Sequence, residues 1–260
     1  MNTTLSVFTT SLALACTPFL VASQSAPGNQ VGGDQSKSAP PTAAKPSAVT
    51  GQFMSDATPI KVGDKIALFN GKDLSGWKGF VPDLIKAGKE SLSVWSVAKD
   101  GTDSTLQCAG NPIGYIETEA LYDNFVLELD WRFDAAKGPG NSGVLLRTTG
   151  EDKVWPKSME AQLESKSAGD FWNIDNVKAT VAAKRTDGRH TTKLRETNEY
   201  PLGQWNHYRI VVNQGTIELW VNGLMQNVAT DVEVVRGRIA LQSEGAYIEF
   251  KNINLFPIVK

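Results

Sequence analysis

The sequence predicts an all-β fold in which two antiparallel sheets pack as a sandwich or jelly roll. Many short segments alternate apolar and polar residues, which is the pattern of strands with one buried face. The dipeptide Asn222-Gly223 separates two such segments and indicates a tight hairpin. Only residues 82–91 keep a helical period, and they keep it weakly. We therefore expect one folded domain built from short strands.

The first 59 residues differ in composition from the rest of the chain. Residues 1–23 contain an apolar run that is too short to span a membrane, followed by small residues, and they resemble a secretory signal peptide. The residues before Cys16 also resemble a lipoprotein cleavage site, so a lipid anchor at Cys16 is the alternative to plain export. Residues 24–59 are rich in Ser, Ala, Pro, Gly and Thr and predict a disordered linker. We expect an exported protein, periplasmic or extracellular, whose folded domain occupies residues 60–260.

Composition limits the partners and the chemistry. The net charge is −2, with 26 basic and 28 acidic residues, which gives no electrostatic reason to expect nucleic acid or an anionic membrane as partner. The only cysteine outside the leader is Cys108, which is expected to be buried and cannot form an internal disulfide. The only histidines are His190 and His207, too few for a zinc site of several imidazoles. A carboxylate and amide site for a divalent cation stays open.

The individual strands are expected from alternation or from short apolar runs. The domain opens near residues 66–71, where an apolar strand meets a turn. The clearest strand is 125–133, with Phe125, Leu127, Leu129, Trp131 and Phe133 on one face and a mostly charged opposite face. Residues 175–200 are polar and lack a strong period, so we expect a loop with short strands that could border a site. The other strands are expected at 92–97, 105–108, 114–118, 141–147, 158–165, 169–174, 205–212, 216–221, 237–245 and 247–253.

A row of polar side chains is expected on one face of the strand at 158–165. The apolar residues of this strand share one face and the polar residues share the other: Met159, Ala161 and Leu163 against Glu160, Gln162 and Glu164. Two carboxylates and an amide at this spacing could present acid, base and hydrogen-bonding groups to a ligand that lies across the sheet. The same pattern also fits the solvated face of an ordinary antiparallel sheet.

A distant strand repeats this pattern, with Gln242 and Glu244 on its polar face. If both strands belong to one curved sheet, these two residues converge with Glu160 and Gln162 on its concave side. Arg147 lies four residues after Gly143 in a third strand, so alternation is expected to place both on the same face of the sheet. Gly143 would leave room above the sheet there.

The residue types expected at this face suit carbohydrate. Amides and acids bond sugar hydroxyls, and the indoles of Trp155 and Trp172, expected in bordering loops, could cover sugar C–H surfaces. The two tryptophans equally fit a role in anchoring loops. The sequence contains no Gly-x-Ser-x-Gly elbow, phosphate loop, dinucleotide fingerprint or Cys-x-x-Cys pair.

Several motifs resemble, in consistent order over residues 64–257, the 3-keto-disaccharide hydrolase family. The motifs are Leu68 to Trp77, Asn141-Ser142-Gly143 leading to Arg147, Glu160-Ala161-Gln162-Leu163, Gly169-Asp170-Phe171-Trp172, Gly203-Gln204-Trp205-Asn206, Val221-Asn222-Gly223, Gly237 to Gly245, and Ile248 to Ile253. The resemblance implies a concanavalin A-like lectin/glucanase jelly roll. This chain has Ser243-Glu244-Gly245 where many members carry Asp-His-Gly, so any role of that histidine would fall to Glu244 or be absent.

The resemblance implies cleavage of glycosides that already carry a ketone at C3 of the sugar. The ketone acidifies the proton on C2, so the C1 substituent can leave by β-elimination before water adds. Such a site needs a base near C2–H, donors or a cation for the C3 oxyanion, and an acid for the leaving oxygen. The expected roles are base for Glu160 or Glu244, oxyanion stabilisation for Arg147 and Gln162 or a divalent cation, and sugar contacts for Asn141, Gln242 and Trp172.

Three other interpretations remain open at this stage. The same carboxylates could work as a conventional glycosidase pair, whose separation would select the stereochemistry. The domain could be a non-catalytic carbohydrate-binding module, because this fold hosts lectins as readily as enzymes. A tethered adhesion or structural domain would fit the long leader.

Overall fold

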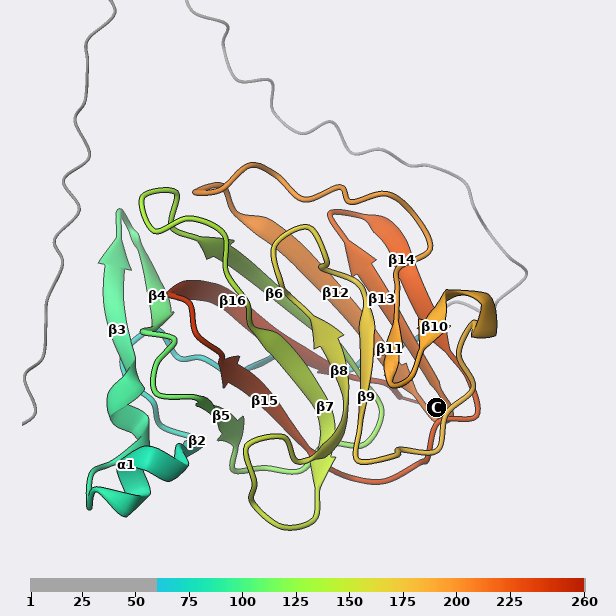
Figure 1. Cartoon of the computed structure of the whole chain (residues 1–260), viewed down its shortest axis with the longest axis horizontal. Coiled ribbons are helices and arrows are strands. Elements are labelled where there is room, and N and C mark those ends of the chain that lie inside the picture. Colours follow the sequence, from blue (N-terminus) through green and yellow to red (C-terminus); the bar gives the residue numbers. More distant parts are fainter. Residues whose placement is uncertain (1–59, 260) are drawn as a thin grey trace, which may run out of the picture. The chain divides into compact units, whose positions relative to one another are not determined.

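The computed structural model describes residues 60–259, which form two eight-stranded sheets with a shared core between them (Figure 1). Neighbouring strands are antiparallel in both sheets. The predicted all-β sandwich of two antiparallel sheets is therefore confirmed. The predicted signal peptide at 1–23, the linker at 24–59 and Cys16 lie outside the described residues.

We call the sheet that carries the predicted polar row the pocket sheet, and the other one the back sheet. The pocket sheet has the order β10 (Thr186–Asp187), β11 (His190–Thr191), β9 (Phe171–Ile174), β8 (Lys157–Gln162), β7 (Gly143–Thr149), β15 (Arg238–Ser243), β5 (Gly114–Thr118) and β2 (Trp77–Phe80). The back sheet has the order β14 (Leu224–Ala229), β13 (Thr216–Val221), β12 (Asn206–Asn213), β6 (Phe125–Phe133), β16 (Ile248–Pro257), β4 (Asp103–Cys108) and β3 (Trp95–Asp100), with β1 (Ile66–Ala67) paired to β16. In Figure 1 the strands β7, β8 and β15 lie in front of β6, β12 and β16.

Alternation decides which side chains enter the core between the sheets. The five alternating apolar residues of β6 from Phe125 to Phe133 are buried there, as predicted, and Trp131 is the largest of them. Met159 and Ala161 of β8 meet them from the pocket sheet. Removing a large side chain of this kind from water stabilises the fold by roughly 1.5–3 kcal/mol. Cys108 is also buried there with a free thiol, as expected.

The weakly helical segment at 82–91 resolves into short turns of helix. Pro82 opens the five-residue helix α1 (Pro82–Lys86), a position where its missing N–H is no loss, and Gly88 follows the helix with a φ of 66°. A 3-10 helix, η1 (Ser91–Val94), then occupies the start of the strand expected at 92–97, so β3 begins only at Trp95. A second 3-10 helix, η2 (Ala183–Arg185), lies in the polar segment 175–200, together with the predicted short strands β10 and β11.

One cross-strand row defines the outer face of the pocket sheet. Antiparallel register places five side chains in a line across neighbouring strands, in the order Trp172, Glu160, Leu145, Ala240 and Glu117. Directly opposed residues of neighbouring strands point to the same face, so Glu160 and Glu117 share it. Glu160 is nevertheless only 5% exposed. The alternative of an ordinary solvated face is therefore wrong for Glu160 and for Gln162, which is 4% exposed, and it holds for Glu164, which is exposed.

The outer face of the pocket sheet is buried because a connecting loop folds back over it. We call residues 150–156, between β7 and β8, the strap. The Tyr115 hydroxyl donates to Asp152 Oδ1 at 3.1 Å, and the Trp155 indole N–H donates to Glu244 Oε1 at 3.3 Å. These contacts hold the strap against a small apolar cluster on this face that includes Leu145 and is fully buried at Tyr115.

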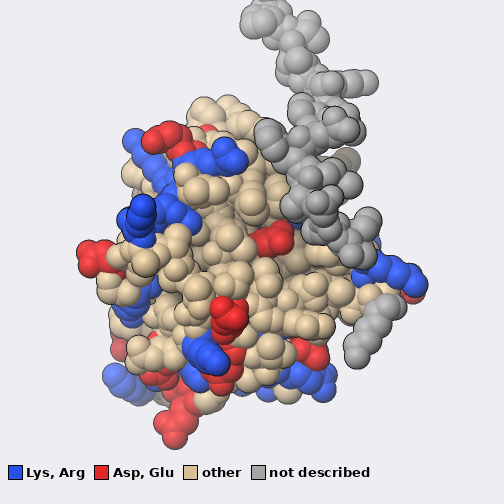
Figure 2. Space-filling model, turned by 90° about the vertical axis from the view of Figure 1, so that its right-hand side faces the viewer, with Lys and Arg blue, Asp and Glu red and all other residues tan. Residues whose placement is uncertain are grey.

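Charged side chains are dispersed over the described surface. Figure 2 shows a face on which lysine and arginine intermingle with aspartate and glutamate, and neither sign forms a continuous patch there. Within residues 60–259, no helix is long and apolar enough to cross a bilayer.

Candidate functional site

A cavity of about 240 Å³ opens on the outer face of the pocket sheet beside the strap. It lies over β8 and β9, where the predicted polar row begins. Its walls combine carboxylates, amides, indoles and one guanidinium: Asn141, Trp155, Glu160, Gln162, Glu164, Trp172, Ile174, Arg189 and Glu244. The expected convergence of Glu160, Gln162 and Glu244 is therefore present in the structure.

Glu160 is a buried carboxyl group without a neutralising contact. Its Oε1 atom has no hydrogen-bond partner within residues 60–259. Burial raises the pKa of Glu160 well above its ordinary value, and repulsion from Glu244 and Glu164 adds to this, while Arg189 opposes it. The group therefore keeps its proton to a higher pH than a solvated glutamate does.

Gly143 lets the side chains of Glu160 and Gln242 approach each other. A Cβ atom on Gly143 would lie 2.3 Å from Glu160 Oε1 and 2.2 Å from Gln242 Oε1, which no real side chain allows. Both oxygens thus occupy the space above this glycine, which fits the prediction that Gly143 leaves room over the sheet. Gln242 is only 2% exposed and does not line the cavity. The expected direct sugar contact by Gln242 is therefore wrong, since Gln242 lies behind Glu160.

Glu244 approaches the cavity from the turn after β15, opposite the strap. Burial raises the pKa of Glu244, an effect opposed by the hydrogen bond from the Trp155 indole and by Arg189. Its Oε2 atom has no partner among the described residues. The two candidate acid–base groups therefore differ, because Glu244 accepts a hydrogen bond from a fixed donor and Glu160 does not.

The two amides of the site offer different atoms to a ligand. Gln162 Oε1 accepts the backbone N–H groups of Leu163 and Glu164, both at 2.8 Å. Only its NH₂ group remains for a ligand, which fits the expected role of donor to an oxyanion. Asn141 Oδ1 is buried without a partner within residues 60–259, so it is an acceptor available to a sugar hydroxyl.

Trp172 and Arg189 form the wall of the cavity on the β9 side. The imidazole of His190 stacks on Trp172 with ring centroids 4.4 Å apart, and the Arg189 guanidinium lies 5.1 Å from the indole centroid. His190 is held in turn by Asp170, 2.8 Å from Nε2 to Oδ2. Trp172 thus lines the cavity as expected, with one ring face already covered.

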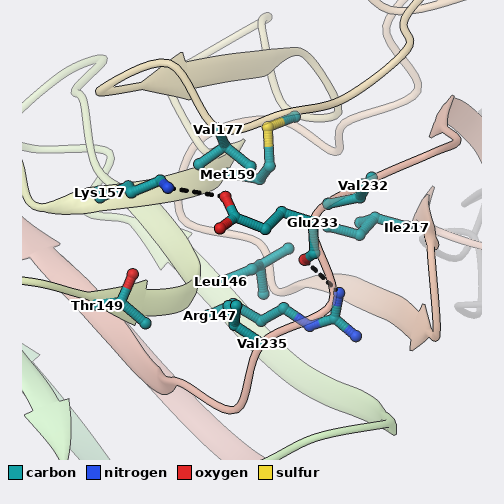
Figure 3. Close-up of a pocket in the computed structure, with 10 residues that line it drawn as sticks. All are labelled: Leu146, Arg147, Thr149, Lys157, Met159, Val177, Ile217, Val232, Glu233 and Val235. Carbon is teal, nitrogen blue, oxygen red and sulfur yellow. Dashed lines mark hydrogen bonds and ion pairs between the residues drawn. The ribbon is translucent and has the colours of Figure 1, made fainter.

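Arg147 does not reach the cavity, and its expected orientation is wrong. In Figure 3 its guanidinium points toward the backbone carbonyl of Glu233, to which it donates at 3.0 Å. It also lies 3.4 Å from oxygens of Asp123 and Asn124. The cavity at this place has a volume of about 10 Å³, space for a single water molecule.

A β-bulge explains the error. The register of β7 shifts after Leu146, and Arg147 has a φ of 55°, in the left-handed region. The alternation counted from Gly143 therefore fails at Arg147. The guanidinium ties β7 to the segment before β15 instead of serving the site.

The cationic group of the cavity is Arg189, which the sequence did not single out. Its side chain comes from the turn between β10 and β11, inside the polar segment 175–200 that was expected to border a site. That expectation is confirmed, but nothing in the segment distinguishes Arg189 from its neighbouring basic residues. Among residues 60–259, no group of three or more His, Cys, Asp or Glu side chains is arranged to hold a metal ion.

Solved structures share this fold. Two crystal structures from Parabacteroides distasonis, each described as a candidate glycosyl hydrolase, match with TM-scores of 0.53 and 0.52 at 21% identity. The first match covers 75% of this chain and 100% of the other, and the second covers 74% and 92%. At this identity the matches support the fold alone.

Sequence relatives carry the comparison further. A curated 3-keto-disaccharide hydrolase from Bacteroides thetaiotaomicron is 27% identical over 169 residues, which cover 61% of this chain and 56% of that protein. The match therefore spans little more than half of the relative's length. The family model described as the 3-keto-alpha-glucoside-1,2-lyase-like domain matches residues 64–255, in agreement with the resemblance seen in the motifs. The chain belongs to this family.

Proposed function

We propose that the protein cleaves glycosides whose sugar carries a ketone at C3, by elimination followed by addition of water. The observation that carries this proposal is the pair of carboxyl groups, Glu160 and Glu244, that face one cavity lined by amides and indoles. The family membership and the name of the Bacteroides relative support the substrate class.

The cavity supplies the groups that this chemistry needs. Glu160 or Glu244 acts as the base at C2, and the other carboxyl group protonates the leaving oxygen. Arg189 and the NH₂ group of Gln162 stabilise the C3 oxyanion in the place first assigned to Arg147. Asn141 accepts a sugar hydroxyl, and the indoles bound the ring.

The test compares a 3-keto-glucoside with its unoxidised parent, using the purified protein with and without divalent cations. Release of the leaving group from the keto substrate alone is the expected result. A requirement for added metal would identify a cation as a further stabiliser of the oxyanion. Equal release from the parent would instead indicate a conventional glycosidase, and saturable binding without release would make this chain a carbohydrate-binding module.

A further inference from the structure

The environments of the two carboxyl groups differ in a way that separates their roles, if the proposed function holds. Glu160 Oε1 and the carbonyl oxygen of Gln242 both lie within 2.3 Å of the position that a Cβ on Gly143 would take, and both atoms are buried and lack a hydrogen-bond partner within residues 60–259. Two acceptors cannot bond each other, and placing them together without a proton leaves both unsatisfied in a low dielectric. With the carbonyl of Gln242 facing Glu160, a proton on Glu160 resolves this, because the acid can then donate to that carbonyl.

Glu244 differs from Glu160 at one oxygen, because its Oε1 atom already accepts a hydrogen bond while its Oε2 atom has no partner within residues 60–259. The indole of Trp155 can only donate, and it donates to Glu244 Oε1 at 3.3 Å. A donor of this kind stabilises the charged form of a carboxyl group. The strap that carries Trp155 makes a second contact, from the Tyr115 hydroxyl to Asp152, and the indole donor is in place without a ligand.

We propose that Glu160 is the acid, protonated in the free protein through its contact with Gln242, and that Glu244 is the base. Glu244 removes the proton from C2, and the electron pair forms the enolate with the C3 oxygen. The enolate then reforms the C3 ketone while a double bond forms between C1 and C2. The C1–oxygen bond breaks with its electron pair, and the leaving oxygen takes the proton of Glu160.

Addition of water returns both groups to their starting states. The Glu160 carboxylate takes a proton from the water that attacks C1, and Glu244 gives its proton back to C2. One water is consumed, the glycosidic bond is broken, and no electrons enter or leave the protein. Gln242 is a positioning residue in this scheme, because it acts only through Glu160.

The first experiment varies the leaving group. Cleavage of the 4-nitrophenyl and methyl 3-keto-glucosides is measured with wild type, E160Q and E244Q. Nitrophenolate can leave without being protonated, whereas methoxide needs a proton from an acid. E160Q is expected to lower kcat/KM for the methyl glycoside about 10²–10⁴-fold more than for the nitrophenyl glycoside. E244Q is expected to lower both equally. E128Q, on the outer face of the back sheet, makes the same chemical change far from the cavity and controls for folding.

Deuterium exchange gives a second signature. In D₂O, E160Q is expected to exchange the C2 proton of the methyl substrate without releasing methanol, and E244Q is expected to exchange nothing. Equal losses on both substrates with E160Q, or exchange that survives in E244Q, would overturn the assignment.

A third measurement does not depend on activity. The infrared difference spectrum of wild type minus E160Q at neutral pH should contain the carbonyl stretch of a protonated carboxylic acid. The difference spectrum of wild type minus E244Q should contain carboxylate bands and no band of a protonated acid. Absence of the protonated band from the E160Q difference refutes the inference. A wild type that cleaves neither keto substrate but shows the band would reject the proposed function and leave the protonation of Glu160 standing.

Discussion

Glu160 and Glu117 lie in the same row of the pocket sheet, with two strands between them, and only one of the two carboxyl groups has ion-pair partners. Both are almost fully buried, at 5% and 3% exposure. Glu117 lies 2.8 Å from Lys78 Nζ and 3.5 Å from Arg238 Nε, whereas Glu160 has no ion pair among the described residues. A buried charge that is paired belongs to the scaffold, and a buried acid left unpaired is available to a ligand.

The outer face of the back sheet repeats the scaffold pattern. There Glu249 pairs with Arg132, Glu128 pairs with Arg209, and Asp130 accepts from His207 at 2.8 Å. The carboxyl groups of the cavity thus differ from those of the scaffold because, among the described residues, Glu160 and Glu244 have no ion-pair partner. The abundance of acidic residues does not distinguish it.

The largest effect is expected for Glu160→Gln. It should lower turnover of a 3-keto-disaccharide about 10²–10⁴-fold, because an acid that touches the reacting atoms is lost. At neutral pH the variant should be at least as stable as wild type, because no ion pair is broken and a buried ionisable group is removed. Steady-state kinetics and thermal melts measure both quantities. A variant that unfolds, or that keeps full activity, contradicts the role of Glu160.

Gly143→Ala is expected to damage the same site through its neighbours. The added Cβ would collide with the side-chain oxygens of both Glu160 and Gln242. Displacing them should lower turnover by at least tenfold and destabilise the fold by about 1–3 kcal/mol. Urea denaturation and kinetics on the same sample test this, with Gly215→Ala, between β12 and β13, as a glycine control whose Cβ would meet no atom closer than 3.6 Å. Unchanged kinetics would mean that the contact over Gly143 has no function.

Glu117→Gln should change stability and leave catalysis nearly intact. It removes a buried carboxylate and leaves Lys78 and Arg238 without it, but Lys78 is 43% exposed and solvent screens the loss. We therefore expect a loss of about 1–2 kcal/mol, below the range for a fully buried pair. Urea titration measures it. A Glu117→Gln variant that is inactive but stable would show that Glu117 belongs to the site and is not part of the scaffold.

The raised pKa of Glu160 predicts that the difference in unfolding free energy between Glu160→Gln and wild type depends on pH. The folded state binds the Glu160 proton more tightly than the unfolded chain, so this group makes stability fall as pH rises from the ordinary carboxyl range through its raised pKa. Glu160→Gln removes that loss, so the free energy of unfolding of the variant minus that of wild type should increase as the pH rises above about 4. Parallel curves for the two proteins would show that Glu160 is not perturbed.

The smallest effect is expected for Glu128→Gln on the back sheet. The pair of Glu128 and Arg209 is half exposed, with 2.6 Å between Oε1 and Nη1. Its loss should lower the free energy of unfolding by about 0–1 kcal/mol, and high salt should remove the difference. A loss that persists in high salt would show that back-sheet pairs contribute more than ordinary surface pairs.

Period-2 alternation determined much of this protein from sequence alone. It predicted both sheets, the inner faces of β6 and β8, and the side of β8 on which Glu160 and Gln162 lie, because alternation is a local property of extended backbone. The family motifs added the concanavalin A-like fold and the chemistry to test.

Only the tertiary structure decided what surrounds these residues. The bulge in β7 turned Arg147 away, the strap placed Trp155 beside Glu244, and the turn between β10 and β11 brought Arg189 into the cavity. Gln242 came to lie behind Glu160 because Gly143 leaves the space. Each of these depends on contacts between segments distant in sequence, and a local pattern does not encode such contacts.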